Sequence, residues 1–187
     1  MDRPKRYPAF IIMAAVIVLD QMSKILVRKY IPMGKWITVG ERLWGDFLQI
    51  GHLENTGAAF SLSLPNPLWN KAFFIGTSVL AVVFILWLLS RATHKIQVVA
   101  FGLVLGGAIG NNLIDRPILG AVTDFVSFDI PDLIRGMERF PVFNVADSAI
   151  FFAMCLLIVD MIFISGKKAP QPESLPTPEI NLPDKEQ

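Results

Sequence analysis

The sequence predicts an α-helical membrane protein with four transmembrane helices, and its composition and the length of its apolar runs are the observations that predict it. Hydrophobic residues make up 53% of the 187 positions and charged residues only 18%, and the mean hydropathy is +0.51. About 20 consecutive apolar residues span the hydrocarbon core of a bilayer. Four such runs occur, roughly at Tyr7–Val27, Leu68–Leu89, Ile96–Ile114 and Val142–Ile164.

The first run is interpreted as a retained helix rather than a cleaved signal peptide. Three basic residues precede it, as they would in a signal peptide: Arg3, Lys5 and Arg6. The run is long, however, it carries Asp20 and Lys24, and no A-x-A-like cleavage site follows it. We therefore expect this segment to remain as the first membrane-spanning helix.

Basic residues predict the orientation of the helices, because Lys and Arg accumulate in cytoplasmic loops. They lie before the first run, between the second and third, and after the fourth: Arg3, Lys5, Arg6, Arg91, Lys95, Lys167 and Lys168. The loop after the first run is also basic and weakens the pattern there, through Arg28, Lys29, Lys35 and Arg42. Four spans with both termini in the cytoplasm fit the charges best.

Two loops on the opposite side are predicted to form structure outside the membrane. Residues 36–39 and 47–53 carry β-branched and aromatic side chains between glycines, which is typical of short strands in a small sheet. Residues 129–140 place apolar side chains at helical spacing. This spacing predicts a short amphipathic helix that lies in the membrane interface.

The composition changes at about Gly166, which divides the chain into a membrane domain, 1–166, and a Pro-rich tail, 167–187. The tail is expected to be disordered and cytoplasmic. The net charge of +1, without a basic cluster, does not indicate nucleic acid binding. His52 and His94 lie far apart and Cys155 is the single cysteine, so neither a metal site nor an internal disulfide is predicted.

Polar residues inside the helices are the candidates for function, because burying charge in a membrane is costly. Asp20 and Lys24 lie four residues apart, so they share one face of the first helix and can pair. The pair either neutralises itself or orients a site. In the third helix, Gly102, Gly106 and Gly110 form small-xxx-small steps, which allow another helix to approach closely.

Two carboxylates in apolar surroundings, Asp124 and Asp147, are predicted to lie on the same outer face. If they meet, the two cannot both be ionised, and they share a proton. The ionised member can then take a proton from water while the protonated member polarises a carbonyl, which is the chemistry of metal-free peptide hydrolysis. The alternative is that each carboxylate is a buried partner of an Asn or Arg side chain.

Other peptidase chemistries lack their motifs, since neither H-E-x-x-H nor G-x-S-x-G occurs. Ser23 and Lys24 are adjacent on a helix, so they point about 100° apart and make a poor nucleophile and base pair. A small proton-coupled transporter is the main rival interpretation, although it would need polar residues at mid-membrane. An assembly or adaptor subunit is the third, and only the glycine steps support it.

Four stretches of the sequence, in this order, resemble the lipoprotein signal peptidase family, the type II signal peptidases of bacteria. They are LDQMSK at 19–24, ENTGAAFS at 54–61, GNNLIDRPILGAVTDF at 110–125 and FNVADSAI at 143–150. The resemblance covers nearly the whole chain up to about Gly166. It implies four transmembrane helices with a small extracytoplasmic β-sheet cradle and a short outer helix, in agreement with the elements predicted above.

The resemblance also implies an activity, a substrate and a location. The activity is that of a membrane-embedded aspartic endopeptidase without a cofactor, for which a monomer suffices. The substrate is a diacylglyceryl-modified prolipoprotein, whose signal peptide is removed by a cut just before the lipidated cysteine. The enzyme would lie among the lipids of the bacterial cytoplasmic (inner) membrane, with its active site near the outer face.

By position, Asp124 and Asp147 match the catalytic pair of the family. Residues expected to support this pair or to hold the substrate are Asp20, Lys24, Asn55, Gly57, Asn112, Arg116 and Asn144. The chain departs from the family pattern GGA-x-GN-x-x-DR, because it has two asparagines where the pattern has one. Asn112 is preferred over Asn111 for the family position, because it lies one helical turn from Arg116.

Overall fold

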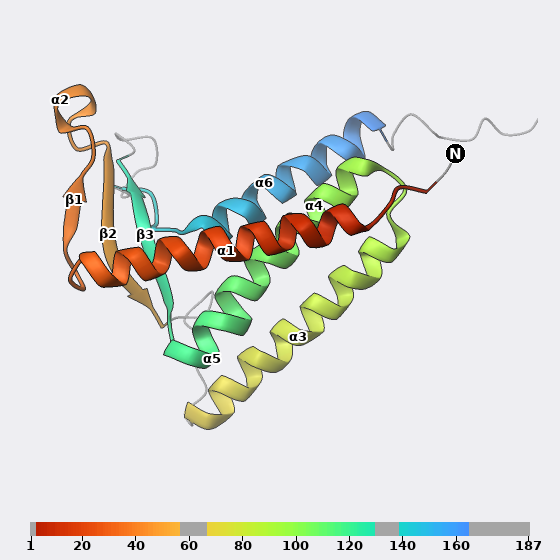
Figure 1. Ribbon diagram of the computed structural model, residues 1–187, viewed down its shortest axis with the longest axis horizontal. Coiled ribbons are helices and arrows are strands. Elements are labelled where there is room, and N and C mark those ends of the chain that lie inside the picture. The colour runs from red at the N-terminus through yellow and green to blue at the C-terminus, as the bar shows by residue number, and fades with distance from the viewer. Residues whose placement is uncertain (1–2, 57–66, 130–138, 165–187) are drawn as a thin grey trace, which may run out of the picture.

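The computed structural model describes residues 3–56, 67–129 and 139–164, and long helices form most of this part of the chain. These helices gather into a bundle with a small sheet at one end (Figure 1). Their bounds are Tyr7–Tyr30 for α1, Pro67–Arg91 for α3, Lys95–Ala108 for α4 and Val145–Val159 for α6. The α4 helix continues through a π-helical segment, η2 at Ile109–Asp115, into the short α5 at Arg116–Leu119. The α6 helix continues into η3 at Asp160–Ile164.

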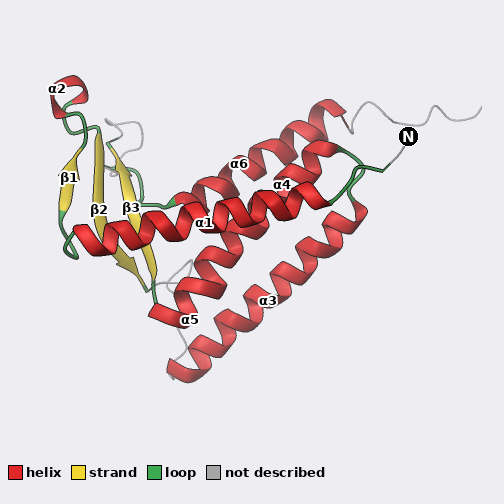
Figure 2. Cartoon of the chain, viewed as in Figure 1, coloured by secondary structure: helices red, strands yellow, loops and turns green. Residues whose placement is uncertain are grey.

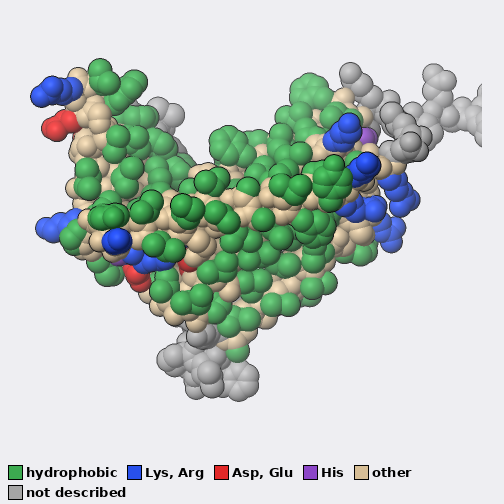
Figure 3. All heavy atoms as spheres, viewed as in Figure 1, with side chains coloured by type: hydrophobic (Ala, Val, Ile, Leu, Met, Phe, Trp, Pro, Cys, Tyr) green, Lys and Arg blue, Asp and Glu red, His purple; other side chains and the backbone are tan. Residues whose placement is uncertain are grey.

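The helices have the dimensions and the surface of a membrane protein. Within the described residues, α1, the continuous helix Lys95–Leu119 and the helix Val145–Ile164 are long and apolar enough to span a bilayer. The remaining long helix, α3, contributes a shorter apolar segment at Ile75–Arg91. Hydrophobic side chains cover the visible face of the bundle, and Lys and Arg gather at its ends (Figure 3). This arrangement confirms the predicted helical membrane fold.

Glycines on α4 set how closely its neighbours approach. A Cβ atom built on Gly106 would lie 2.6 Å from Cβ of Val16 on α1, and one built on Gly102 would lie 2.7 Å from the backbone oxygen of Ala9. On another face of α4, a Cβ atom on Gly107 would lie 2.5 Å from the backbone oxygen of Ala146 on α6. The predicted close approach is confirmed, and α1 is the helix that packs against Gly102 and Gly106.

Two of the basic segments that charge predicts on one side, the one before α1 and the one between α3 and α4, lie together. The Arg6 guanidinium, before α1, donates to the backbone oxygens of Leu89 and Ser90 at 3.1 and 2.6 Å. The start of α1 and the end of α3 therefore lie side by side. At the same end, Asp160 accepts hydrogen bonds from His94 at 2.8 Å and Gln97 at 2.7 Å, which fastens the end of α6 to the start of α4.

The sheet has three antiparallel strands in the order β1-β2-β3 (Figure 2). Strands β1 at Trp36–Thr38 and β2 at Leu48–Asn55 confirm the two predicted strands, and a short helix, α2 at Glu41–Trp44, lies between them. The third strand, β3 at Val122–Phe128, was not predicted. It pairs with β2 so that Asp124 lies opposite Leu53, which makes the segment around Asp124 part of the sheet.

Three sequence predictions fall on residues outside the described ranges. The interfacial helix expected at 129–140 lies mostly in 130–138, and Gly57 lies in 57–66. The expected C-terminal tail, 167–187, also lies outside. These remain predictions.

Candidate active site

One asparagine contacts both of the predicted catalytic carboxylates. The Asn144 side-chain amide donates to Oδ1 of Asp124 at 2.7 Å. The Asn144 backbone N–H donates to Oδ2 of Asp147 at 3.2 Å. Asp124 comes from β3 and Asp147 from the first turn of α6, so the site forms where the sheet meets the helical bundle.

The position of Asp147 follows from how α6 begins. Asn144 has an extended backbone, with φ −131° and ψ −173°, and it caps the helix by accepting the N–H of Asp147 through its side-chain oxygen at 3.0 Å. The Asp147 carboxylate in turn accepts the N–H of Asn144, which completes a capping box. Asp147 is therefore fixed by the helix start itself, whereas its side chain remains partly exposed.

Asp124 is held in a more enclosed position, with only 3% of its surface exposed. Its second oxygen, Oδ2, accepts a hydrogen bond from the Asn55 amide on β2 at 3.1 Å. The pKa of Asp124 is raised to about 6, chiefly by burial and also by the nearby charge of Asp147, while the hydrogen bonds from Asn55 and Asn144 lower it. Asp124 therefore holds a proton up to about pH 6.

A fully buried lysine, Lys24, lies next to the site and is paired with two further carboxylates. Lys24 lies 2.7 Å from Asp20 on its own helix and 2.6 Å from Asp115 on η2. The predicted Asp20–Lys24 pair is confirmed, and Asp115 joins it. Asp20 also accepts the backbone N–H of Ala146, the residue before Asp147, at 3.0 Å. The buried ions thus connect α1 to the start of α6.

Asn111 links Lys24 to Asp147. Its side-chain oxygen accepts from Lys24 at 2.6 Å and from Asn144 at 3.2 Å, and its Nδ2 donates to Oδ1 of Asp147 at 2.8 Å. Asn112 instead accepts a hydrogen bond from Nε of Arg116 at 3.2 Å. The preference for Asn112 at the site is corrected: the one-turn relation to Arg116 holds, but it is Asn111 that faces the carboxylates.

Two further supporting residues were missed at the sequence level. Gln21 donates to Asp115 at 3.0 Å and to Asp20 at 3.1 Å. Arg28, at the end of α1, donates to the hydroxyl of Thr123 at 2.8 Å, directly beside Asp124. Gln21 lies within the LDQMSK stretch at 19–24, so the resemblance of that stretch to the family could have indicated it. Nothing local to Arg28 distinguishes it from an ordinary interfacial arginine.

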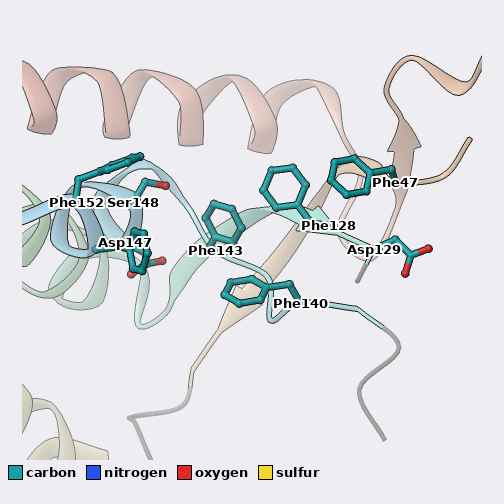
Figure 4. Close-up of a pocket in the computed structure, with 9 residues that line it drawn as sticks. Phe47, Phe128, Asp129, Phe140, Phe143, Asp147, Ser148 and Phe152 are labelled. Atoms are coloured by element: carbon teal, nitrogen blue, oxygen red, sulfur yellow. The ribbon is translucent and has the colours of Figure 1, made fainter. Parts of the chain in front are cut away.

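An aromatic pocket opens beside Asp147 (Figure 4). It has a volume of about 710 Å³, and apart from Asp129, Asp147 and Ser148 its lining consists of Phe47, Phe128, Phe140, Phe143, Phe151 and Phe152. Phe47 directly precedes β2 and Phe128 ends β3, while the other rings come from the segment before α6 and from α6 itself. The pocket therefore offers an apolar path from the helical bundle to a carboxylate. No group of three His, Cys, Asp or Glu side chains suited to a metal occurs among the described residues.

Comparison with known proteins gives the family. Residues 12–163 match the family described as Signal peptidase (SPase) II. The chain belongs to the signal peptidase II family. Curated relatives named "Lipoprotein signal peptidase" include that of Serratia marcescens, 38% identical over 80% of this chain and 81% of its own. Another is that of Maridesulfovibrio salexigens, 39% identical over 83% of this chain and 95% of its own.

Two solved structures of bacterial membrane enzymes share the fold of this chain. A bacterial membrane enzyme determined by the in meso method at 2.3 Å superposes with a TM-score of 0.70 at 24% identity, covering 88% of this chain and 93% of its own. A second, at 1.9 Å, gives 0.69 at 26% identity, covering 84% and 94%. The family membership makes this chain a multi-pass membrane peptidase, in place of the transporter and adaptor interpretations.

Proposed function

We propose that the chain is an aspartic endopeptidase that removes signal peptides from diacylglyceryl-modified prolipoproteins, by cutting just before the lipidated cysteine. One observation carries the aspartic mechanism: Asn144 holds both Asp124 and Asp147, at 2.7 and 3.2 Å. The family membership supports the lipoprotein substrate, since the relatives carry the name lipoprotein signal peptidase. No cofactor or metal takes part in this mechanism, and one copy of the chain contains both carboxylates.

The reaction needs one proton on the pair of carboxylates. The ionised member removes a proton from water, whose oxygen attacks the scissile carbonyl, while the protonated member donates a hydrogen bond to the carbonyl oxygen. The tetrahedral intermediate then collapses: the C–N bond breaks, and the amine of the new N-terminus leaves with the proton that the carboxylate had taken from water. Asp124 suits the proton-holding role, because its pKa is raised to about 6.

The surrounding polar residues keep the two carboxylates in place. Asn55 and Asn144 bind Asp124, and Asp20 fixes the turn that carries Asp147. Catalytic groups gain most when they are positioned before the substrate arrives, because little reorganisation is then needed. Gly57 and Arg116 remain candidates for contact with the backbone or lipid of the substrate.

The aromatic pocket supports a substrate that arrives from the membrane. Phe151 and Phe152 are exposed on α6 and also line the pocket beside Asp147. An apolar chain can therefore pass from lipid to the carboxylates without crossing a polar surface. We place the enzyme in the bacterial inner membrane with both termini cytoplasmic, with the site near the outer face, and with the segment 167–187 as a cytoplasmic tail.

A cleavage assay tests the proposal. Wild type, Asp124→Asn and Asp147→Asn are incubated in detergent or vesicles with a prolipoprotein that does or does not carry diacylglyceryl, and products are followed by gel shift. Asp46→Asn is the matched control, since the Asp46 side chain is 71% exposed and lies 3.8 Å from Arg139 rather than at the pair. We expect wild type and the control to cut only the lipidated substrate, and both pair variants to be inactive although folded. Normal cleavage by either variant would refute the aspartic mechanism.

A further inference from the structure

The continuous helix Lys95–Leu119 changes its register against α1 at the active site. Along α4 and the start of η2, glycines meet α1 at every fourth residue: Gly102 faces Ala9, Gly106 faces Val16 and Gly110 faces Asp20. Asp115 continues this row by contacting Lys24, and it comes five positions after Gly110 rather than four. The step of five falls within the π-helical segment Ile109–Asp115.

The π-helical segment accounts for this step. A π turn closes a hydrogen bond to the fifth residue and so takes up one residue more than an α-helical turn. In an uninterrupted α-helix, the residue four positions after Gly110 would be Ile114. Lys24 is fully buried and would then face an apolar side chain in place of Asp115, and a buried charge without its partners is costly.

On the face of the helix that packs against α6, contacting residues keep the ordinary spacing of four. Gly107 contacts Ala146, and Asn111 follows it by four positions and contacts Asp147, the next residue of α6. The orientation of the Asn111 amide is fixed by chemistry, because Lys24 can only donate and a carboxylate accepts. Its oxygen must face Lys24 and its nitrogen must face Asp147.

We infer that Asn111 is the positioning residue for Asp147, and that Asn112 is the extra residue that the π turn accommodates. The inference rests on the proposed role of Asp147 in catalysis. Asn111 accepts a hydrogen bond from the buried Lys24 at 2.6 Å and donates one to Asp147 at 2.8 Å, so Lys24 fixes the amide that holds the carboxylate. Asn112 points elsewhere, toward Arg116. Two identical neighbours therefore have different tasks.

The adjacent asparagines provide a matched pair of variants for the test. Asn111→Leu and Asn112→Leu make the same change on the same helix, and each is assayed for kcat, KM and thermal unfolding beside wild type. We expect Asn111→Leu to lose about 100-fold in kcat with KM unchanged, because a misplaced catalytic group costs about that much. Asn112→Leu should keep most of its kcat. A reversed order, or equal losses in both variants, overturns the inference.

A deletion separates the extra residue from the positioning residue. Deleting Asn111 or Asn112 gives the same chain, because the two are adjacent and identical. The deletion restores a four-residue step from Gly110 to the aspartate and leaves one asparagine facing α6, so we expect cleavage to persist. A folded deletion variant as slow as Asn111→Leu contradicts the inference, and the leucine pair decides alone if the deletion variant does not fold. If wild type itself cuts nothing, the proposed function fails first.

Discussion

Asn144 and Asp147 cap the first turn of α6 for each other. The N–H of Asp147 donates to the side-chain oxygen of Asn144 at 3.0 Å, and the N–H of Asn144 donates to the carboxylate of Asp147 at 3.2 Å. The side-chain nitrogen of Asn144 donates a hydrogen bond to Asp124 at 2.7 Å. A common helix-capping motif therefore also sets the relation between two carboxylates from different elements.

Substitution of Asn144 separates its capping role from its role at the site. Asn144→Ser keeps an oxygen for the N–H of Asp147 but lacks the amide that reaches Asp124, whereas Asn144→Ala lacks both. We expect both variants to lose on the order of 100-fold in kcat, as for removal of other active-site donors. Only the alanine variant should lose about 1 kcal/mol of stability, which is typical of a lost N-cap. Kinetics and thermal unfolding in detergent measure the two effects, and wild-type kcat in Asn144→Ser would contradict the bridging role.

The pH dependence of cleavage should reflect Asp124. Its pKa is raised to about 6, so the carboxyl is protonated below that pH and ionised above it. Because hydrolysis requires one proton on the pair, we expect kcat/KM, which reports pKa values of the free enzyme, to fall as the pH rises above about 6. A pH profile of kcat/KM with the lipidated substrate checks this, and a value that keeps rising through pH 8 would exclude Asp124 as the proton holder.

Asn55→Leu should move this fall in activity, the alkaline limb of the pH profile, to higher pH. The hydrogen bond from Asn55 stabilises the ionised form of Asp124 and lowers its pKa, so losing the bond raises the pKa further. Asn112→Leu is the matched control, because its side chain contacts Arg116. The limb should stay in place in the control, and a limb that moves to lower pH in Asn55→Leu would contradict the assignment.

Close helix packing should make Gly107 sensitive to a single methyl group. Gly107→Ala places Cβ 2.5 Å from the backbone oxygen of Ala146, directly before Asp147, so α6 must shift. We expect a lower unfolding temperature and slower cleavage. Gly76→Ala on α3 is the comparison, since a Cβ atom there has nothing within 4 Å, and it should be neutral or stabilise by up to about 1 kcal/mol. Equal effects in thermal unfolding would show that the α4–α6 contact is not tight.

The aromatic pocket predicts that Phe152, on α6, binds substrate and that Phe163, on η3, does not. Phe152 and Phe163 are both 60% exposed, but only Phe152 lines the pocket. Phe152→Ala should raise KM for the lipidated substrate by about tenfold, since burying a phenylalanine contributes about 1.5–3 kcal/mol. Phe163→Ala should leave KM unchanged. Steady-state kinetics on both variants checks this, and an equal rise in both would mean that a general effect on the membrane helices is responsible.

Local patterns in the sequence were sufficient for most of the elements. Apolar runs located the long helices, β-branched residues located β1 and β2, and the spacing of Asp20 and Lys24 predicted their pair. The strand β3 was missed, because its residues are buried in succession and do not alternate. Its seven residues mix apolar side chains with Thr123, Asp124 and Ser127 in no regular alternation, so the segment gives no period-two signal for a strand.

The sequence by itself determined which side chains are costly to bury, and so which ones the fold must pair: Asp20, Lys24, Asp124 and Asp147. Only the tertiary structure decided how they are paired. Asp115 reaches Lys24, and Asn111 rather than Asn112 reaches Asp147, because a π turn changes the register of the helix against α1 and leaves its register against α6 unchanged. Spacing along a chain fixes faces only while the helical repeat is constant, and packing between distant segments is what changed that repeat here.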